Sequence, residues 1–331
     1  MLRNRALLFD FPCSIPIPYA EAWRWQRALL GARTSARDAG VRATLPDVIF
    51  ALEHKSVYTL GRAARVADLR FGQSDIANGV GDAGGVLPPS PRGADVVAVD
   101  RGGKVTWHGP GQLVVYPLLD LKLRFRCDLH WYVRGVEESI IIALREGAGL
   151  HAFRRAGSPG VWVGGVNSER KIAAIGMNAS KWATQHGFAI NVAPDLRAFD
   201  DIVPCGIADR GVTSIKQELG AENDIFTLSN KTFKEKALSA LAKVFDLEYQ
   251  AAVAVTGGDV NDTEMGKATR DRAGVLTREW EALVGDGRGG GGGKRRGKRR
   301  APREERLRSR FALSICAVNL RPGALSSQKH K

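Results

Sequence analysis

Residues 95–121 read DVVAVDRGGKVTWHGPGQLVVYPLLDL, and the prediction of the fold class starts from this stretch. Half of its first six residues, 95–100, are β-branched valines, and this segment has the composition of a strand. Two turns follow at 102–103 and 109–111, where glycine allows the backbone to approach a neighbouring group closely. Taken alone, the stretch indicates strands connected by glycine-rich turns, with His108 on the surface.

Similar strand-like segments occur on both sides of this stretch. They are DVIFALEH (47–54), SVYTLGR (56–62), GVWVG (160–164), RKIAAIGM (170–177) and a segment that contains HGFAINVA (186–193). Helical periodicity is found over residues 19–34, 128–147 and 229–245. Because strands and helices are mixed without the strand–helix alternation of parallel-sheet proteins, we expect an α+β fold.

Two of the expected helices carry clear local signals. The middle helix begins after Asp128, a typical N-cap residue, and we expect it to end at Gly147. In the first helix, Ala20, Trp23 and Leu30 form the expected apolar side.

The positive charge of the chain is concentrated near its end. The formal net charge is +14, and residues 287–331 hold fourteen Lys and Arg against two Glu, which leaves about +2 for the rest. A nearly neutral body suits a metabolic enzyme or a protein binder better than a nucleic-acid reader. We therefore expect a folded domain over residues 1–250, with a loop insertion at 63–94, and a disordered, low-complexity basic tail over 251–331.

The four cysteines are Cys13, Cys127, Cys205 and Cys316, and they lie far apart in the chain. Without a C-x-x-C pair or paired histidines, we expect no metal site and no disulfide framework, which favours a reducing compartment. No run of eighteen apolar residues is present, so we expect no membrane-spanning segment. Only a handful of residues precede the expected domain, and we see no clear transit peptide.

Cys205 is the most unusual of these residues because it stands in IVPCGIAD (202–209), between a proline and a glycine. An isolated P-C-G is usually an ordinary turn, but such a turn can also present a sulfur to a cleft. A nucleophilic cysteine reacts as the thiolate, which a nearby lysine would stabilise, although Lys171 at a strand edge is by itself usually a solvated residue. Backbone N–H groups in glycine-rich turns are suitable oxyanion donors.

Four motifs occur in a fixed order over roughly residues 8–245. They are RGG-x-V-T-x-HGPGQ-x3-YP, K-I-A-A-I-G, HG-x-A-x-N-V-x2-DL and F-x2-I-V-P-C-G. In this order they resemble the lipoyl(octanoyl) transferase family, and DLHWYVRGVEESI, GVWVG and SKWATQHG look closest to the plastidial forms of plants. The resemblance implies the α+β fold of biotin and lipoate protein ligase catalytic domains, in which helices flank a mixed sheet.

The resemblance also implies site residues and a reaction. The acyl-thioester cysteine of the family falls on Cys205, and its activating lysine falls on Lys171. The family's acyl pocket falls on Arg101, Gly102, Gly103, Lys104, Val105, Thr106, Trp107, His108, Ala174, Ile175, Gly176, His186, Gly187 and Phe188. We expect His108 and His186 to shape this pocket and donate hydrogen bonds, although pairing of a histidine with Cys205 stays open.

The implied reaction moves an octanoyl group from octanoyl-acyl carrier protein to a lysine of a lipoyl domain by ping-pong transfer, without a metal or cofactor. The expected acceptors are the E2 subunits of 2-oxoacid dehydrogenases and the H protein of glycine cleavage. No nucleic acid or membrane partner is expected. The plant resemblance implies the chloroplast stroma, with the mitochondrial matrix as the alternative.

Two other functions remain open on the sequence alone. The first is an ATP-dependent lipoate or biotin ligase on the same fold, which activates a free acid as an adenylate and needs no nucleophilic cysteine. The second is an RNA- or protein-binding module whose basic tail carries the interaction. The family provides no template for residues 251–331 and therefore says nothing about the role of the tail.

Overall fold

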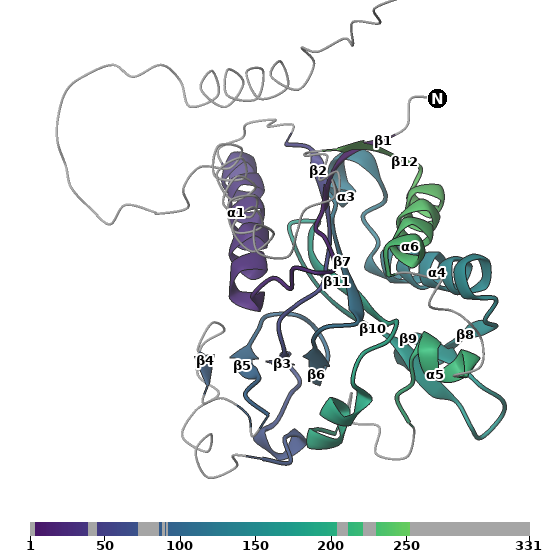
Figure 1. Ribbon diagram of the computed structural model, residues 1–331. Helices are drawn as coiled ribbons and strands as arrows, with labels where there is room; N and C mark the ends of the chain where they lie inside the picture. Colours follow the sequence, from purple (N-terminus) through teal and green to yellow (C-terminus); the bar gives the residue numbers. More distant parts are fainter. Residues whose placement is uncertain are drawn as a thin grey trace, which may run out of the picture. The chain divides into compact units, whose positions relative to one another are not determined.

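The glycine-rich stretch contributes strands to two different β-sheets. Strands β5 (Asp95–Ala98) and β6 (Val105–His108) belong to a four-stranded sheet, and β7 (Gln112–Leu118) lies inside an eight-stranded one. The computed structural model describes residues 4–38, 45–71, 86–87, 90, 92–203, 211–220 and 230–251, all within one compact unit. The sharp turn at 109–111 therefore passes the chain from the small sheet to the large one (Figure 1).

The large sheet is mixed. Its order is β12-β1-β2-β7-β11-β10-β9-β8, with β12, β1 and β2 parallel and the remaining pairs antiparallel. The strands of this sheet other than β7 are β1 (Asn4–Asp10), β2 (Asp47–Leu52), β8 (Ala152–Arg155), β9 (Ser158–Val163), β10 (Arg170–Ser180), β11 (Ala183–Asn191) and β12 (Leu247–Ala251).

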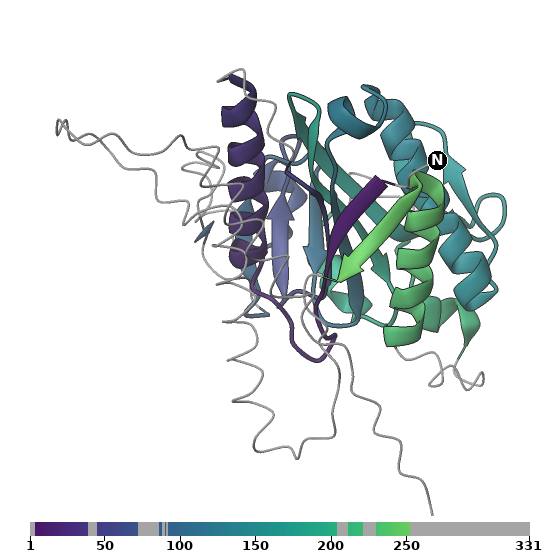
Figure 2. The same cartoon turned by 90° about the horizontal axis from the view of Figure 1, so that it is seen from above.

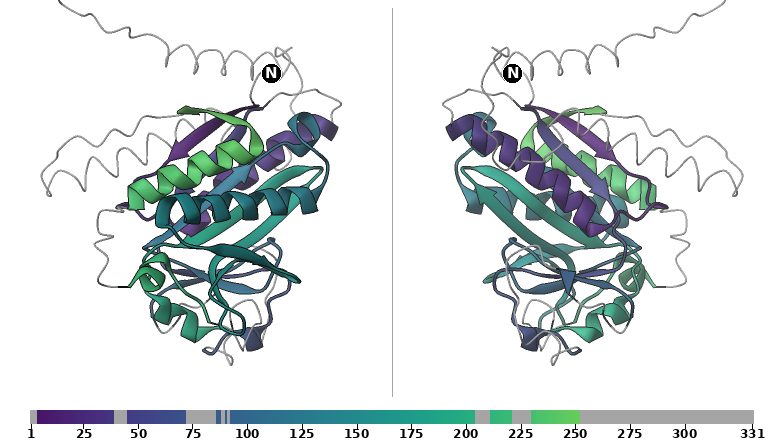
Figure 3. Two further views of the ribbon diagram at one scale, coloured as in Figure 1. Left: turned by 90° about the vertical axis from the view of Figure 1, so that its right-hand side faces the viewer. Right: turned by 90° about the vertical axis from the view of Figure 1, so that its left-hand side faces the viewer.

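Helices cover both faces of this sheet. Helix α1 (Tyr19–Asp38) lies on one face, and α4 (Leu129–Ala148) and α6 (Asn230–Phe245) lie together on the other (Figures 2 and 3). The main core fills the space between the sheet and α4 and α6, where Ile140, Leu144 and Phe233 are buried. The expected α+β class, with a mixed sheet flanked by helices, is confirmed.

The small sheet has the order β4-β5-β3-β6. Besides β5 and β6 it contains β3 (Val57–Leu60) and the short β4 (Val86–Leu87). Its core packs against the 3₁₀ helix η2 (Leu196–Asp201) through Tyr58, Trp107 and Phe199. The smaller elements are η1 (Val66–Asp68), α3 (Leu121–Arg124) and α5 (Ile215–Leu219). None of the described helices combines the length and apolar character needed to cross a membrane.

Several sequence expectations are corrected by the structure. Helix α4 begins after the predicted cap Asp128, but it continues past Gly147 to a C-cap at Gly149, whose φ is +64°. Gly147 lies inside the helix, where glycine leaves room for α6: a Cβ there would be only 3.1 Å from the ring of Phe233. In α1 the buried face includes Trp23, as expected, whereas Ala20 is exposed.

The strands at the outer positions of the large sheet were not expected from the sequence. Strands β1 and β8 have no strict period-2 pattern, whereas β12 alternates over only five residues, and the structure places all three at or near the two ends of this sheet. The predicted loop insertion at 63–94 is described only in part, as η1, β4 and the turns beside them.

Candidate functional site

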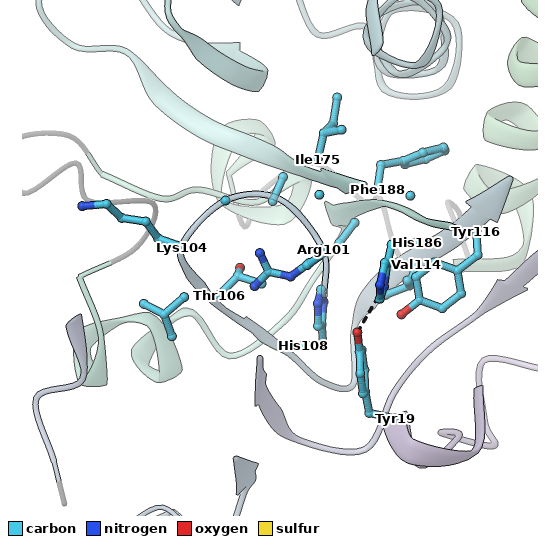
Figure 4. Close-up of a pocket in the computed structure, with 16 residues that line it drawn as sticks. Tyr19, Arg101, Lys104, Thr106, His108, Val114, Tyr116, Ile175, His186 and Phe188 are labelled. Atoms are coloured by element: carbon cyan, nitrogen blue, oxygen red, sulfur yellow. Dashed lines mark hydrogen bonds between the residues drawn. The ribbon is translucent and has the colours of Figure 1, made fainter. Parts of the chain in front are cut away.

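A cavity that is open to solvent lies between the two sheets and is lined mainly by β6, β7, β10 and β11 (Figure 4). All but two of the predicted lining residues line it, and the exceptions are Gly102 and Trp107. The indole of Trp107 packs edge-on against Phe199 in the small core, with ring centroids 5.6 Å apart. The N–H of Gly102 donates to the carbonyl of Met177, 2.8 Å away.

Four further residues line the cavity and were not predicted: Tyr19, Val114, Tyr116 and Ala189. The alternation of Val114 and Tyr116 along β7 could have indicated that the two side chains share a face of a strand. Tyr19 has no such signal, because it belongs to a helix that begins more than eighty residues before β6.

Glycine makes room for the cavity wall. Gly176 on β10 pairs with Gly187 on β11. A Cβ on Gly176 would lie 2.8 Å from Cδ of Arg101, and a Cβ on Gly187 would lie 2.2 Å from the carbonyl oxygen of Val115. Real Cβ atoms do not approach neighbours this closely, so Gly176 allows the Arg101 side chain to lie against β10, and Gly187 allows β7 to lie close to β11.

Arg101 is buried in this wall, with 6% of its surface exposed. Its guanidinium donates to the carbonyl oxygen of Thr59 at 2.7 Å, to the hydroxyl of the same residue at 2.9 Å and to the carbonyl of Gly102 at 2.9 Å. These bonds tie the loop before β6 to the neighbouring strand β3, and they fix the side chain that forms the middle of the cavity wall (Figure 4).

Two histidines beside the cavity are held in defined tautomers by their partners. Nδ1 of His54 lies 2.8 Å from the carbonyl of Ile17 and therefore donates, so that Nε2 accepts from the Tyr116 hydroxyl at 2.7 Å. Nδ1 of His108 donates in the same way to Oε1 of Gln112, at 2.7 Å. Burial lowers the pKa of His54 to about 4 and that of His108 to about 3, so both rings are neutral near pH 7.

His186 has an unusual backbone. Its φ is +61°, in the left-handed region that few non-glycine residues adopt, and its N–H donates to Oε1 of Gln26 at 2.7 Å. Its Nε2 lies 2.8 Å from Oδ1 of Asp100, which also accepts a bond at Oδ2 from Asn178 at 2.9 Å. Burial lowers the pKa of His186 more than Asp100 raises it, so the ring is neutral. Nδ1 is then left to accept from the Tyr19 hydroxyl, 3.4 Å away.

Lys171 stands near the start of β10, on the strand that also carries Ala174 to Gly176, and it does not line the cavity. Its side chain is buried: Nζ donates to the carbonyl of Pro159 at 3.2 Å and lies 4.8 Å from the ring centre of Trp162. The ring face attracts the ammonium group electrostatically. The neighbouring Gly160 has a φ of +121°, and a Cβ there would lie 2.6 Å from the carbonyl oxygen of Ala173, so glycine allows β9 to approach β10 closely at this point.

Cys205 lies outside the described residues, in the segment 204–210. The described chain that follows this segment returns to Lys171. The backbone N–H of Lys171 donates to the carbonyl of Gly211, and the N–H of Thr213 donates to the carbonyl of Lys171, both at 3.0 Å. On the other side of the segment, the N–H of Val203 donates to the carbonyl of Asp68 at 2.8 Å. In the described part of the chain, no group of His, Cys, Asp and Glu is arranged as metal ligands would be.

Comparisons with known proteins agree with this architecture. Residues 18–242 match the family described as the lipoyl protein ligase A/B catalytic domain. Among solved structures, an archaeal bipartite lipoate protein ligase from Thermoplasma acidophilum superposes with a TM-score of 0.51 and 14% identity, over 86% of this chain and 97% of that one. At this identity the likeness shows the fold alone, and it confirms the expected ligase-type catalytic domain.

Curated relatives are considerably closer in sequence. An octanoyltransferase from Thermosynechococcus vestitus is 40% identical over 233 residues, which is 70% of this chain and 88% of the relative. A chloroplastic octanoyltransferase from Arabidopsis thaliana is 39% identical over 234 residues, 71% of this chain and 75% of the relative. The chain therefore belongs to the octanoyltransferases, acyltransferases built on the lipoyl protein ligase A/B catalytic domain.

Proposed function

We propose that the chain transfers octanoyl groups through a thioester on Cys205, with Lys171 as the activating cation. One observation carries the proposal. Lys171 is hydrogen-bonded through its backbone to Gly211, directly after the segment that contains Cys205, and the same strand lines the cavity three residues later at Ala174. This connection supports a reactive end near Lys171 and an acyl chain that extends along β10.

The reaction consists of two transfers. The Cys205 thiolate attacks the octanoyl thioester of the acyl carrier protein, the C–S bond to the carrier breaks, and the carrier leaves as a thiol after taking up a proton. The ε-amine of the acceptor lysine then attacks octanoyl-Cys205, which releases the Cys205 thiol and forms an amide after the amine loses a proton. An amide has resonance that a thioester largely lacks, so the transfer is favourable without ATP.

Lys171 has a role in each step. Its ammonium group stabilises the Cys205 thiolate and then gives a proton to the thiolate of the leaving carrier. The neutral amine that remains takes the proton from the attacking acceptor amine. The proposed acceptors are lipoyl domains of 2-oxoacid dehydrogenase E2 subunits and the H protein of glycine cleavage. The chloroplastic relative supports a location in the chloroplast stroma, with the mitochondrial matrix as the alternative.

The cavity suits a saturated acyl chain. Val105, Val114 and Phe188 contribute apolar surface to its lining, and the nearby histidines are neutral. A hydrocarbon tail gains about 0.8 kcal/mol per buried CH₂ group and requires no polar partner. Recognition of the chain therefore depends on shape and burial.

Intact-protein mass spectrometry with octanoyl-acyl carrier protein tests the proposal. The wild type should gain the mass of one octanoyl group and lose it when a lipoyl domain is added. Cys205→Ser should gain no thioester, whereas the matched control Cys127→Ser, at an exposed cysteine, should be acylated normally. Lys171→Ala should be acylated at least a hundredfold more slowly than the control Lys181→Ala.

Two results would contradict the proposal. Acylation of Cys205→Ser at the wild-type rate would exclude this cysteine as the nucleophile. Modification of the lipoyl domain from free octanoate and ATP, without a covalent acyl-protein, would instead identify a ligase.

A further inference from the structure

We propose that Asn191 is a positioning residue for acyl transfer: its side-chain amide holds Thr213 against the backbone of Lys171 and thereby fixes the place of the Lys171 ammonium group. The inference rests on the proposed role of Lys171. Asn191 is the last residue of β11 and does not line the cavity.

The backbone of Lys171 lies where the large sheet is irregular. The register between β9 and β10 shifts between Lys171 and Ala173. The pairing of β10 with β11 ends at Ala173, opposite Ile190. Residues 211–213, the 211–213 strip, lie beside Lys171 instead, and Val212 bridges to it in the parallel sense. This strip binds both backbone groups of Lys171, so that its position determines where the lysine side chain begins.

The side chain of Asn191 attaches this strip to the rest of the sheet. Its Nδ2 donates to the carbonyl oxygen of Thr213 at 2.8 Å, and its Oδ1 accepts from Nε2 of Gln112, also at 2.8 Å. All three residues are buried, with at most 4% of their surfaces exposed. Losing the amide would therefore leave a buried carbonyl oxygen without its donor, and the strip would shift to find another.

The orientation of the Asn191 amide is fixed by its partners. A backbone carbonyl can only accept, so the NH₂ group of Asn191 faces Thr213 and its oxygen faces Gln112. Gln112 then donates through Nε2 and accepts at Oε1, where Nδ1 of His108 donates at 2.7 Å. The hydrogen bonds therefore run in one direction, from the cavity wall to the 211–213 strip.

A second anchor binds the same residue of the strip. The Thr213 hydroxyl donates to Oε1 of Glu218 on α5 at 2.6 Å, and the guanidinium of Arg170 donates twice to the Glu218 carboxylate, both times at 2.8 Å. Arg170 directly precedes Lys171, and 35% of its side chain is exposed. Water therefore competes with this ion pair more than with the buried bond of Asn191.

The far end of the Lys171 side chain is bound to a different strand. Its Nζ donates to the carbonyl of Pro159 and lies over the ring of Trp162, both on β9. The ammonium group keeps its place only while the backbone of Lys171 stays at a constant distance from β9. A displacement of about 1 Å in a reactive group is enough to slow a reaction about a hundredfold.

The test measures the rate at which iodoacetamide alkylates Cys205 as a function of pH, by mass spectrometry of the tryptic peptide that contains this cysteine. In the wild type, Lys171 should hold the pKa of the Cys205 thiol below its ordinary value. Asn191→Leu keeps the size of the side chain and removes both hydrogen bonds. It should raise this pKa by about 1 and lower kcat of octanoyl transfer about tenfold or more, with less than about a twofold change in KM for octanoyl-acyl carrier protein.

The matched control is Thr184→Val, near the opposite end of β11 from Asn191. Thr184 is also buried, and its hydroxyl donates to the carbonyl of Pro117 and accepts from the N–H of Leu119, both at 2.8 Å. The control should lose stability as Asn191→Leu does, but it should keep the wild-type alkylation profile and kcat, because its bonds are made to β7 and the residue after it.

The outcomes separate this inference from the proposed function. A wild-type alkylation profile and kcat in folded Asn191→Leu would show that Asn191 does not position Lys171. An equal rise of the thiol pKa in Asn191→Leu and Thr184→Val would assign the change to lost stability and also overturn the inference. If Asn191→Leu does not fold, Asn191→Ser decides by the same criteria, since its hydroxyl is one bond shorter than the amide. If the wild type forms no octanoyl-Cys205, it is the proposed function that fails.

Discussion

Nε2 of His54 lies 2.7 Å from the Tyr116 hydroxyl and accepts a hydrogen bond from it, because Nδ1 donates to the carbonyl of Ile17. Burial lowers the pKa of His54 to about 4. In the unfolded chain this histidine takes up a proton near pH 6.5, whereas in the folded protein it does so only near pH 4. Its contribution to stability is therefore complete above pH 6.5 and is lost as the pH falls toward 4.

We predict that the free energy of unfolding of the wild type falls more steeply with acid than that of His54→Gln. The shift of His54 corresponds to about 3 kcal/mol between pH 7 and pH 4. Urea denaturation at several pH values measures the free energy of unfolding of both proteins. The difference between the two values at each pH isolates His54, because the other buried histidines are present in both proteins. Parallel curves would show that His54 is not buried in the neutral form.

Gly176 and Gly31 provide a matched pair of glycine substitutions. Gly176→Ala should destabilise the protein by about 1–3 kcal/mol and slow octanoyl transfer, because its Cβ would press against Arg101 at 2.8 Å. Gly31→Ala on α1 should stabilise the protein by about 1 kcal/mol, since nothing lies within 4 Å of the added carbon. Thermal melts and transfer rates test both; equal effects from the two substitutions would contradict the close approach at Gly176.

The buried pair of Arg33 and Asp47 joins α1 to β2. Nη2 of Arg33 lies 3.4 Å from Oδ1 of Asp47, which also accepts from the backbone N–H of Asp120 at 2.7 Å. We predict that Asp47→Ala lowers the free energy of unfolding by about 3–5 kcal/mol, because it leaves the buried guanidinium without its counter-ion. Glu248→Gln, in an exposed pair with Arg5, is the control and should not measurably shift the urea midpoint.

The hairpin between β10 and β11 turns through Lys181 and Trp182, whose φ values are +48° and +66°. Two-residue turns of this kind favour Asn-Gly, since other residues are strained at positive φ. Replacing the pair by Lys181→Asn and Trp182→Gly should therefore stabilise the protein by about 1 kcal/mol, as a higher Tm would show. Octanoyl transfer should not change, because the turn lies at the opposite end of β10 from Lys171; a lower Tm would contradict the strain.

The sequence by itself determined the elements that depend on neighbouring residues. Strands β2, β3 and β9, the cap of α4 at Asp128 and the extent of α6 follow from local periodicity and capping. The ordered motifs predicted the family, and most of the predicted lining residues surround one cavity. The placement of Cys205 lies outside the described residues, and its role stays a prediction.

Only the tertiary structure decided which distant residues complete the cavity. Tyr19 reaches His186 because α1 packs on the large sheet, and Gly147 leaves room for Phe233 of α6. The tautomer of His54 depends on Ile17 and Tyr116, which strand pairing brings near, whereas that of His108 is fixed by Gln112, only four residues later in the chain. Local sequence patterns do not encode such contacts, since each depends on how separate segments pack together.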